Sequence, residues 1–260
     1  MNTPKIITLG LALMLTVFMS SCDVEDICTS GQGSVVDSTF VLPNFTGIDL
    51  QMAGNVYLKQ GPVQSVRIVG QPNILEKLNM SVGNQIWAID VDGCIRNYEA
   101  LEVYVTIPEI DYLRVSGSGD IVSDSVLIVD DVEILLTGSG NIDVAMDADF
   151  VYSRLTGSGT ISLDALINSK LETKTTGSGS YVLAGRVPKY DVEIVGSGDI
   201  KAFDMVTSEA EVKISGSGDA EVLVEDSLTI DISGSGDVAY KGNPSLDIEI
   251  TGSGRVVDAN

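Results

Sequence analysis

Hydrophobic and polar residues alternate along the chain from about residue 102 to the C-terminus. Alternation with a period of two is typical of a β-strand that buries one face. Val, Ile and Thr dominate these segments, and such residues favour strands over helices. The clearest run has, at every second position, Leu228, Ile230, Ile232, Gly234, Gly236, Val238 and Tyr240. The pattern therefore predicts a chain made mostly of half-buried strands.

The tripeptide Gly-Ser-Gly punctuates this alternation eight times, at intervals of 21, 19, 20, 19, 20, 18 and 18 residues. Its copies begin at Gly117, Gly138, Gly157, Gly177, Gly196, Gly216, Gly234 and Gly252. We also interpret Ala53-Gly54-Asn55 as a degenerate earlier copy. If the backbone stays extended, both glycines lie on the apolar face, and Ser and the residue after the motif point outward. Glycine at such positions suits a sharp corner.

A period of this length is too short for a repeat that contains a helix, and it fits one turn of a β-solenoid. Stacked turns would place each strand beside its copy in the next turn, parallel and about 4.8 Å away. Connections between parallel strands are overwhelmingly right-handed. We therefore predict an all-β fold, a right-handed parallel β-helix with turns of about 19–20 residues, over residues 111–260.

Residues 40–110 lack the regular motif and carry several shorter strand patterns. Alternation predicts strands over 48–58, 66–69, 86–91 and 102–107, and residues 73–78 could form one helical turn. Trp87 is most simply a core residue of this region. We predict an irregular β-rich N-terminal cap that merges into the solenoid, because an uncapped end would expose a strand edge.

The first 21 residues read as a bacterial lipoprotein signal peptide. Lys5 precedes an apolar run over residues 6–18, and Met19-Ser20-Ser21-Cys22 resembles a lipobox, so Cys22 would be lipidated. Residues 22–39 are predicted to be an acidic tether whose first acids resemble a surface-export signal of Bacteroidetes lipoproteins. This predicts an outer-membrane lipoprotein of the cell envelope, exposed at the surface and touching the membrane only through its lipid. The alternatives are an ordinary signal peptide and a merely solvated acidic linker.

Two further cysteines, Cys28 and Cys94, could pair in an oxidising compartment and tie the tether to the first folded segment. Because the sequence gives no distance between them, two free or buried thiols remain the alternative.

Charge and composition exclude several classes of function. The chain has 37 Asp and Glu against 15 Lys and Arg, a formal charge of −22, and no histidine. Such a charge disfavours binding to nucleic acid or to anionic lipid headgroups. Without histidine, catalytic triads that use histidine and zinc sites that bind through histidine are excluded.

The whole layout resembles a known family. Its signs are the Phe45-x-x-Ile48 strand followed by Gln60-Gly61, the strand Val103-x-Val105-x-Ile107-Pro108, and the Gly-Ser-Gly-Asp repeats. The chain resembles the putative auto-transporter adhesin, head GIN domain family of Bacteroidetes over about residues 40–256. The resemblance implies a β-helical cell-surface or periplasmic lipoprotein, named adhesin by analogy, and it supplies no catalytic residues.

The positions that follow Gly-Ser-Gly form a candidate binding or cation stripe. Its members with carboxylate or amide side chains are Asp120, Asn141, Asp199, Asp219 and Asp237. Stacked in register, adjacent carboxylates would repel each other by about 1 kcal/mol in water and by more near a shielded surface. Turn amides could offset this as hydrogen-bond donors, with Arg255 one turn beyond the last Asp. Alternatively, a bound calcium ion could offset the repulsion between the carboxylates, because the stripe provides only hard oxygen ligands.

We expect a non-catalytic, surface-anchored interaction or structural module that presents this stripe to a protein or glycan. The alternatives are a polysaccharide-active β-helix enzyme and a calcium-stabilised spacer without a ligand. The enzyme would need irregular loops and aromatic platforms, yet the intervals vary by at most three residues. Finally, the tail after the last motif would either fold over the solenoid end or leave it to associate end to end as a homo-oligomer.

Overall fold

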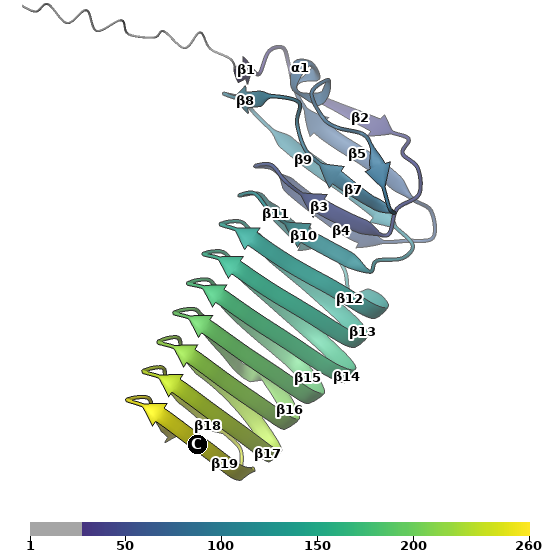
Figure 1. Ribbon diagram of the computed structural model, residues 1–260. Helices are drawn as coiled ribbons and strands as arrows, with labels where there is room; N and C mark the ends of the chain where they lie inside the picture. The colour runs from purple at the N-terminus through teal and green to yellow at the C-terminus, as the bar shows by residue number, and fades with distance from the viewer. Residues whose placement is uncertain (1–27) are drawn as a thin grey trace, which may run out of the picture.

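The computed structural model describes residues 28–260, so that the predicted signal peptide (1–21) and Cys22 lie outside the described residues. The chain forms a right-handed β-solenoid of about seven turns, with a spacing of about 20 residues, below an N-terminal cap (Figure 1). This confirms the predicted fold class. The solenoid strands are β10 (Tyr112–Val115), β11 (Asp120–Ser123), β12 (Leu127–Gly138), β13 (Asn141–Gly157), β14 (Thr160–Gly177), β15 (Ser180–Gly196), β16 (Asp199–Gly216), β17 (Ala220–Gly234), β18 (Val238–Lys241), β19 (Ser245–Gly252) and β20 (Val256–Asp258).

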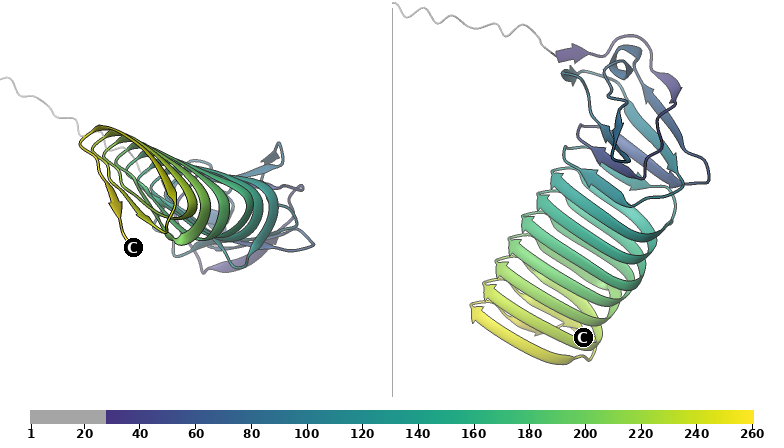
Figure 2. Two further views of the ribbon diagram at one scale, coloured as in Figure 1. Left: turned by 90° about the horizontal axis from the view of Figure 1, so that it is seen from below. Right: turned by 45° about the vertical axis from the view of Figure 1, so that its right-hand side comes forward.

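Each full turn is a single long strand that runs from one Gly-Ser-Gly to the next and bends once on the way. In β13 the bend coincides with a shift in its pairing with β14, between Ala148 and Phe150. We call the part that follows Gly-Ser-Gly the first arm and the part that leads to the next motif the second arm. The arms of successive turns stack as two layers of a flattened coil, and the turns nest closely along the axis (Figure 2).

The core lies between the two arms and is filled by every second side chain. Along β13, for example, Ile142 and Val144 of the first arm and Val151 and Leu155 of the second arm are all buried. Parallel pairing in register places the first three over apolar residues of the next turn and Leu155 over the buried Thr175. One contiguous apolar core therefore extends from the cap into the last turns.

The Gly-Ser-Gly corner departs from the extended conformation assumed from sequence. Gly157 has a φ of +136°, and a Cβ there would lie 2.2 Å from the carbonyl oxygen of Gly138. The second glycine, Gly159, is buried, and a Cβ there would lie 1.9 Å from the carbonyl oxygen of Gly140. The exposed Ser158 between them donates its backbone N–H to the oxygen of Gly138 at 3.0 Å. The corner thus requires glycine because successive corners touch through their backbones.

The cap contains further rungs of the same coil, stacked out of sequence order. Strand β3 lies between β7 and β10, and β4 lies between β9 and β11, all in parallel. The predicted strand over 48–58 is therefore two strands, separated by a corner at Ala53-Gly54-Asn55 whose Asn55 aligns with Asp120. The bounds are β3 (Gly47–Leu50), β4 (Asn55–Gln60), β7 (Ile86–Ile89) and β9 (Leu101–Ile107).

Antiparallel strands and one helical turn complete the cap. Strand β5 pairs antiparallel with both β9 and β2, and a short hairpin joins β6 to β7. Trp87 is fully buried, as expected, and its indole N–H donates to the carbonyl oxygen of Asn79 at 3.0 Å. The remaining elements are β1 (Cys28–Ser30), β2 (Val36–Phe40), β5 (Ser65–Gly70), α1 (Pro72–Leu75), β6 (Val82–Gly83) and β8 (Cys94–Arg96).

Residues 28–39 differ from the tether expected over 22–39, because β1 and most of β2 belong to the cap. Strand β2 is an edge strand with mostly exposed side chains, so that no alternation of apolar residues reveals it in the sequence. Its backbone pairs with β5 from Val36 to Phe40. The cap therefore begins at β1.

The C-terminal tail does not fold over the end of the solenoid. Strand β20 pairs in parallel with β18 and continues the first-arm layer, and the Asn260 side chain bonds the backbone of Gly242. Ile248 of β19 is 41% exposed, whereas Ile230 at the same place in the preceding turn is 1% exposed. End-to-end association of two molecules stays a prediction.

Replacement of Gly157 by Ala tests the corner. The variant has to place a Cβ against the Gly138 carbonyl at a positive φ, and we expect a loss of about 2 kcal/mol or more in unfolding free energy. Chemical denaturation followed by circular dichroism measures it. Ser158→Ala is the matched control, because that side chain is exposed, and it should leave the midpoint unchanged. Equal midpoints for both variants would contradict the backbone-contact account.

Candidate binding groove on the second-arm face

The outer face of the second arms, hereafter the second-arm face, carries two columns of side chains in register. The residues five positions before each Gly-Ser-Gly form the first column, namely Tyr112, Glu133, Tyr152, Glu172, Asp191, Glu211, Thr229 and Asp247. The residues three positions before it form the second column, namely Arg114, Leu135, Arg154, Lys174, Glu193, Lys213, Asp231 and Glu249. Parallel pairing without offset turns a repeated sequence position into a line along the molecule.

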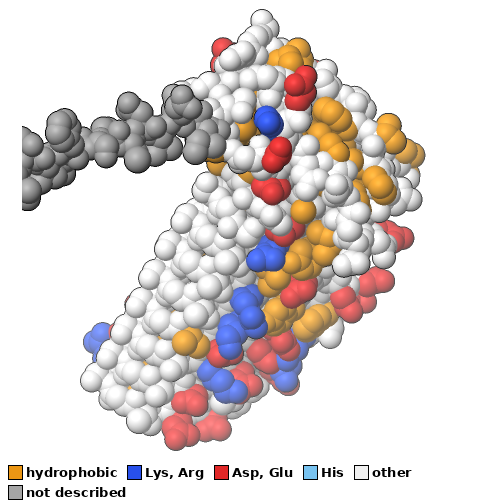
Figure 3. All heavy atoms as spheres, turned by 45° about the horizontal axis from the view of Figure 1, so that its top comes forward, with side chains coloured by type: hydrophobic (Ala, Val, Ile, Leu, Met, Phe, Trp, Pro, Cys, Tyr) orange, Lys and Arg blue, Asp and Glu red, His pale blue; other side chains and the backbone are white. Residues whose placement is uncertain are grey.

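This face interleaves basic side chains with the carboxylates of the two columns. Six of the chain's 15 basic residues project from it, namely Arg114, Arg154, Lys170, Lys174, Lys189 and Lys213. Three of the lysines, Lys170, Lys174 and Lys213, form ion pairs. In these pairs Lys170 bridges Glu172 and Asp191, Lys174 contacts Glu193 at 2.6 Å, and Lys213 contacts Glu211. Figure 3 shows basic, acidic and hydrophobic side chains mixed along the solenoid, beside a paler band without charge.

Three depressions on this face share the side chain of Tyr152 and together form what we call the second-arm groove. One, of about 590 Å³, lies where the cap meets the solenoid and is lined by Tyr112, Phe150 and Tyr152. The next, of about 340 Å³, lies between Arg114 and Arg154. A third, of about 300 Å³, continues past Lys174 toward Lys213. The groove therefore runs along the solenoid axis from the cap.

The half-buried aromatic rings near the cap are placed differently from the fully buried rings of the solenoid. Tyr181 and Tyr190 lie in the core, where their hydroxyls bond Ser153 and Thr173 at 3.0 Å. Burial raises the pKa of both phenols, so that they stay neutral and take no part in the surface. Tyr112, Phe150 and Tyr152 instead line the second-arm groove near the cap.

The predicted stripe lies on the first arm, outside this groove. Pairing in register places Asp120 beside Asn141, and the line of Asp199, Asp219 and Asp237 begins three turns beyond Asn141. Thr160 and Ser180 separate the two groups. The structure thus brings Asp199, Asp219 and Asp237 together and keeps Asp120 apart from them.

Backbone amides of the next turn satisfy the carboxylates of this stripe. Asp219 donates its N–H to the Asp199 carboxylate at 3.2 Å, and Asp237 donates its own to Asp219 at 2.8 Å. Arg255 closes the line with a backbone bond to Asp237 and a guanidinium contact at 2.6 Å, which lowers the pKa of that carboxyl. Within residues 28–260, no group of three or more Asp, Glu or Cys side chains is arranged to hold a metal ion.

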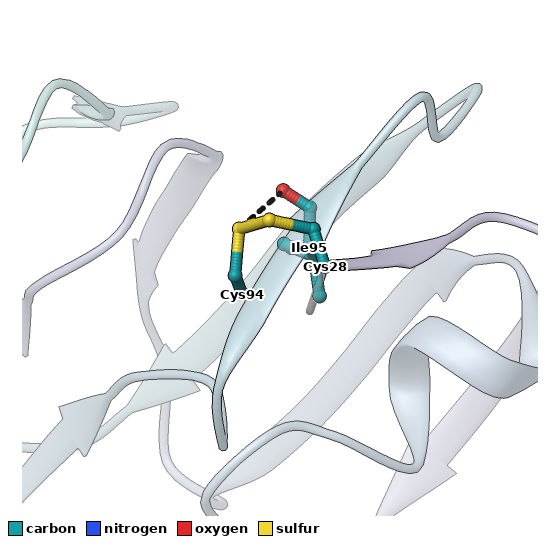
Figure 4. Close-up of a disulfide and its surroundings, with 3 residues drawn as sticks. All are labelled: Cys28, Cys94 and Ile95. Carbon is teal, nitrogen blue, oxygen red and sulfur yellow. Dashed lines mark hydrogen bonds between the residues drawn. A yellow bond between two sulfur atoms is a disulfide. The ribbon is translucent and has the colours of Figure 1, made fainter. Parts of the chain in front are cut away.

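Cys28 and Cys94 form a disulfide between β1 and β8, with their Cα atoms 4.4 Å apart (Figure 4). The two strands pair in parallel and the cysteines face each other in register. The bond closes a loop with a sequence separation of 66 residues. It therefore fixes the start of the described chain to the cap. Cys22 lies outside the described residues.

Sequence reasoning missed the second-arm groove although the sequence carries its signal. Tyr152 and Arg154 precede Gly157 by five and three positions, and Glu172 and Lys174 precede Gly177 by the same offsets. Aligning the repeats on their first glycine would have shown both columns. The position after the motif is the more conspicuous candidate site in the sequence, because Asp recurs there.

Comparisons with known proteins agree with this fold. The family model of the putative auto-transporter adhesin, head GIN domain matches residues 44–244. A crystal structure of a putative adhesin from Parabacteroides merdae is 20% identical, covers 88% of this chain and 99% of its own, and has a TM-score of 0.84. A putative adhesin from Parabacteroides distasonis is 22% identical, with 88% and 98% covered and a TM-score of 0.80.

A third solved structure has a different description. It is a putative lipid binding protein from Parabacteroides distasonis, 22% identical, with 88% of this chain and 99% of that chain covered and a TM-score of 0.78. At these identities the likeness establishes the fold and no ligand. No curated protein sequence matches the chain. Across residues 28–260 there is no helix both long and apolar enough to cross a membrane.

Substitutions at Asp219 separate a hydrogen-bonded stripe from a cation site. Asp219→Asn keeps an acceptor for the Asp237 N–H and removes a repelling charge, so we expect an unchanged or slightly higher unfolding midpoint. Asp219→Ala loses the acceptor and should cost about 1 kcal/mol. Thermal melts in EDTA and in added calcium provide the second measurement, and we expect equal midpoints. A midpoint that rises with calcium, and does so less in Asp219→Asn, would instead indicate a cation site.

Removal of the disulfide tests whether it stabilises the attachment of β1 and β2 to the rest of the cap. In Cys28→Ser/Cys94→Ser the unfolded chain is no longer restricted by the disulfide-closed loop and gains conformational entropy. On the loop-entropy model this lowers the unfolding free energy by about 4 kcal/mol. We expect faster hydrogen exchange in β1, β2 and β8 and unchanged exchange in β14–β16, because solenoid turns contact only their neighbours. The reduced native protein is the matched control and should behave like the double variant. Unchanged exchange in β1 and β2 would show that strand pairing alone holds them.

Proposed function

Because the chain belongs to the putative auto-transporter adhesin, head GIN domain family, we propose that it is a non-catalytic interaction module that binds a protein or glycan partner at the cell surface. The observation that carries the proposal is the second-arm groove, where aromatic rings, arginines and lysines lie together with carboxylates. Exposed aromatic rings and arginines are the residue types most enriched where proteins bind partners.

The architecture suits presentation away from a surface. The disulfide ties the start of the described chain to the cap, and the solenoid extends from the cap toward the other end of the chain (Figure 1). We propose that Cys22 carries the lipid that anchors the protein to the outer membrane, with the tether leading to the cap. A lipid anchor there would leave the groove, which runs along the solenoid, accessible to a partner.

Ion pairing argues against catalysis by the carboxylates of the groove. A glycosidase needs one carboxyl that keeps its proton until it donates it to the leaving group. Glu172 and Asp191 both contact Lys170, and Glu193 contacts Lys174. These three carboxylates already serve as salt-bridge partners of lysines within the described chain. Binding therefore explains these groups better than polysaccharide cleavage does.

Binding of the full chain to glycan arrays and to arrays of extracellular proteins tests the proposal. The groove variant Arg154→Glu/Lys174→Glu reverses two charges on the second-arm face. Arg186→Glu/Lys201→Glu is the matched control, because it makes the same change in net charge elsewhere on the solenoid. We expect at least one glycan or protein to bind wild type and control, and binding to fall about tenfold in the groove variant, which is the loss of one or two charged hydrogen bonds.

Two outcomes would contradict the proposal. One is an absence of binding to both arrays by a protein whose circular dichroism shows it folded. The other is binding that the groove variant leaves intact. Incubation with the same glycans should release no new reducing ends, and their appearance would overturn the non-catalytic assignment.

A further inference from the structure

The middle depression of the second-arm groove has an unusual floor and unusual walls. Leu135 of β12 forms its floor and interrupts the column of charged residues between Arg114 of β10 and Arg154 of β13. The two arginines are two turns apart, about 9.6 Å along the axis. An apolar patch therefore lies between two guanidinium groups in a pocket of about 340 Å³.

Both arginines retain donor capacity, unlike the lysines further along the groove. The only bond of Arg154 within the described chain is to the hydroxyl of Tyr152, at 2.7 Å, and its guanidinium lies 5.8 Å from that ring. Arg114 forms an ion pair with Asp49 at 3.8 Å, which is too long for a hydrogen bond, and its buried Nε has no acceptor among residues 28–260. Guanidinium groups bind carboxylates through bidentate hydrogen bonds, so Arg114 and Arg154 together favour an anionic ligand.

The remaining walls fit a polyhydroxylated ligand. Glu133 and Tyr152 lie on one side of Leu135, and Thr137 and Thr156 lie on the other. Glu133 is exposed and has no salt bridge within the described residues, so that its carboxylate can accept bonds from ligand hydroxyls. The threonine hydroxyls can donate or accept. Leu135 and the tyrosine ring offer apolar surface to the C–H groups of a ring.

We propose that this pocket binds the carboxylate-bearing unit of an acidic saccharide. The sugar carboxylate lies against Arg154 and Arg114, its ring packs on Leu135 and Tyr152, and its hydroxyls bond Glu133 and the threonines. This assignment rests on the proposed binding function and names the ligand class for it. An acidic peptide fits less well, because glutamate and aspartate side chains offer neither a ring to pack on Leu135 and Tyr152 nor hydroxyls to bond the threonines.

Calorimetric titration of the full chain with trigalacturonic acid in EDTA-containing buffer tests the proposal. Galactotriose is the matched neutral probe, and a tetraglutamate peptide is the matched acidic one. Arg154→Gln removes one guanidinium from the pocket, and Arg186→Gln removes one from an exposed site outside the groove. We expect trigalacturonic acid to bind wild type and Arg186→Gln alike, to bind Arg154→Gln about tenfold more weakly, and to bind far better than either other probe.

Other results would overturn the assignment. If galactotriose binds as tightly as trigalacturonic acid, the pocket does not recognise the carboxylate. If tetraglutamate binds more tightly, the ligand class is an acidic peptide and not a saccharide. Binding unaffected by Arg154→Gln would place the site elsewhere. If trigalacturonic acid fails while an array ligand is lost in the groove variant, the ligand class is wrong and the binding function stands; if both fail in folded protein, both proposals fall.

Discussion

The backbone contact between successive Gly-Ser-Gly corners is the constraint on which the rest of the structure depends. At each corner a carbonyl oxygen of one turn lies where a Cβ of the next turn would have to fit, and it also accepts the serine N–H. Only glycine allows this approach. Because the contact repeats from turn to turn, it brings the strands back into register at each corner, although the turns vary from 18 to 21 residues and their pairing shifts between the corners. Core packing then follows from the alternation of apolar residues between the corners.

Register at the corner also decides how charge is distributed over the surface. A residue type that recurs at one offset from the glycines becomes a column at the spacing of neighbouring strands. For Asp199, Asp219 and Asp237 this spacing brings like charges together, and the amides of the next turn supply the hydrogen bonds that offset their repulsion. On the second-arm face the columns mix lysines with carboxylates, which neutralise each other and leave Arg154 without a carboxylate partner in the described chain.

Local sequence patterns predict most strands of the cap and not the order in which these strands stack. Individual strands such as β5, β7 and β9 follow from local alternation, and so does the burial of Trp87. The order in which they stack does not, since β3 and β4 lie between the rung of β7 and β9 and the rung of β10 and β11. Strand β2 was hidden because an exposed edge strand needs no apolar face. The second-arm groove was missed because its residues become neighbours only once the turns are aligned.

The sequence by itself determined the solenoid: the parity of apolar residues, the parallel stacking and the position of the corners. These are local properties, because a few consecutive residues determine which side chains share a face of a strand and where glycine allows unusual backbone dihedrals. Only the tertiary structure decided the stacking order of the cap, the pairing of Cys28 with Cys94 and the pocket between Arg114 and Arg154. Each of these depends on contacts between residues that are 39 to 66 positions apart, and no local sequence pattern specifies which distant segments come together.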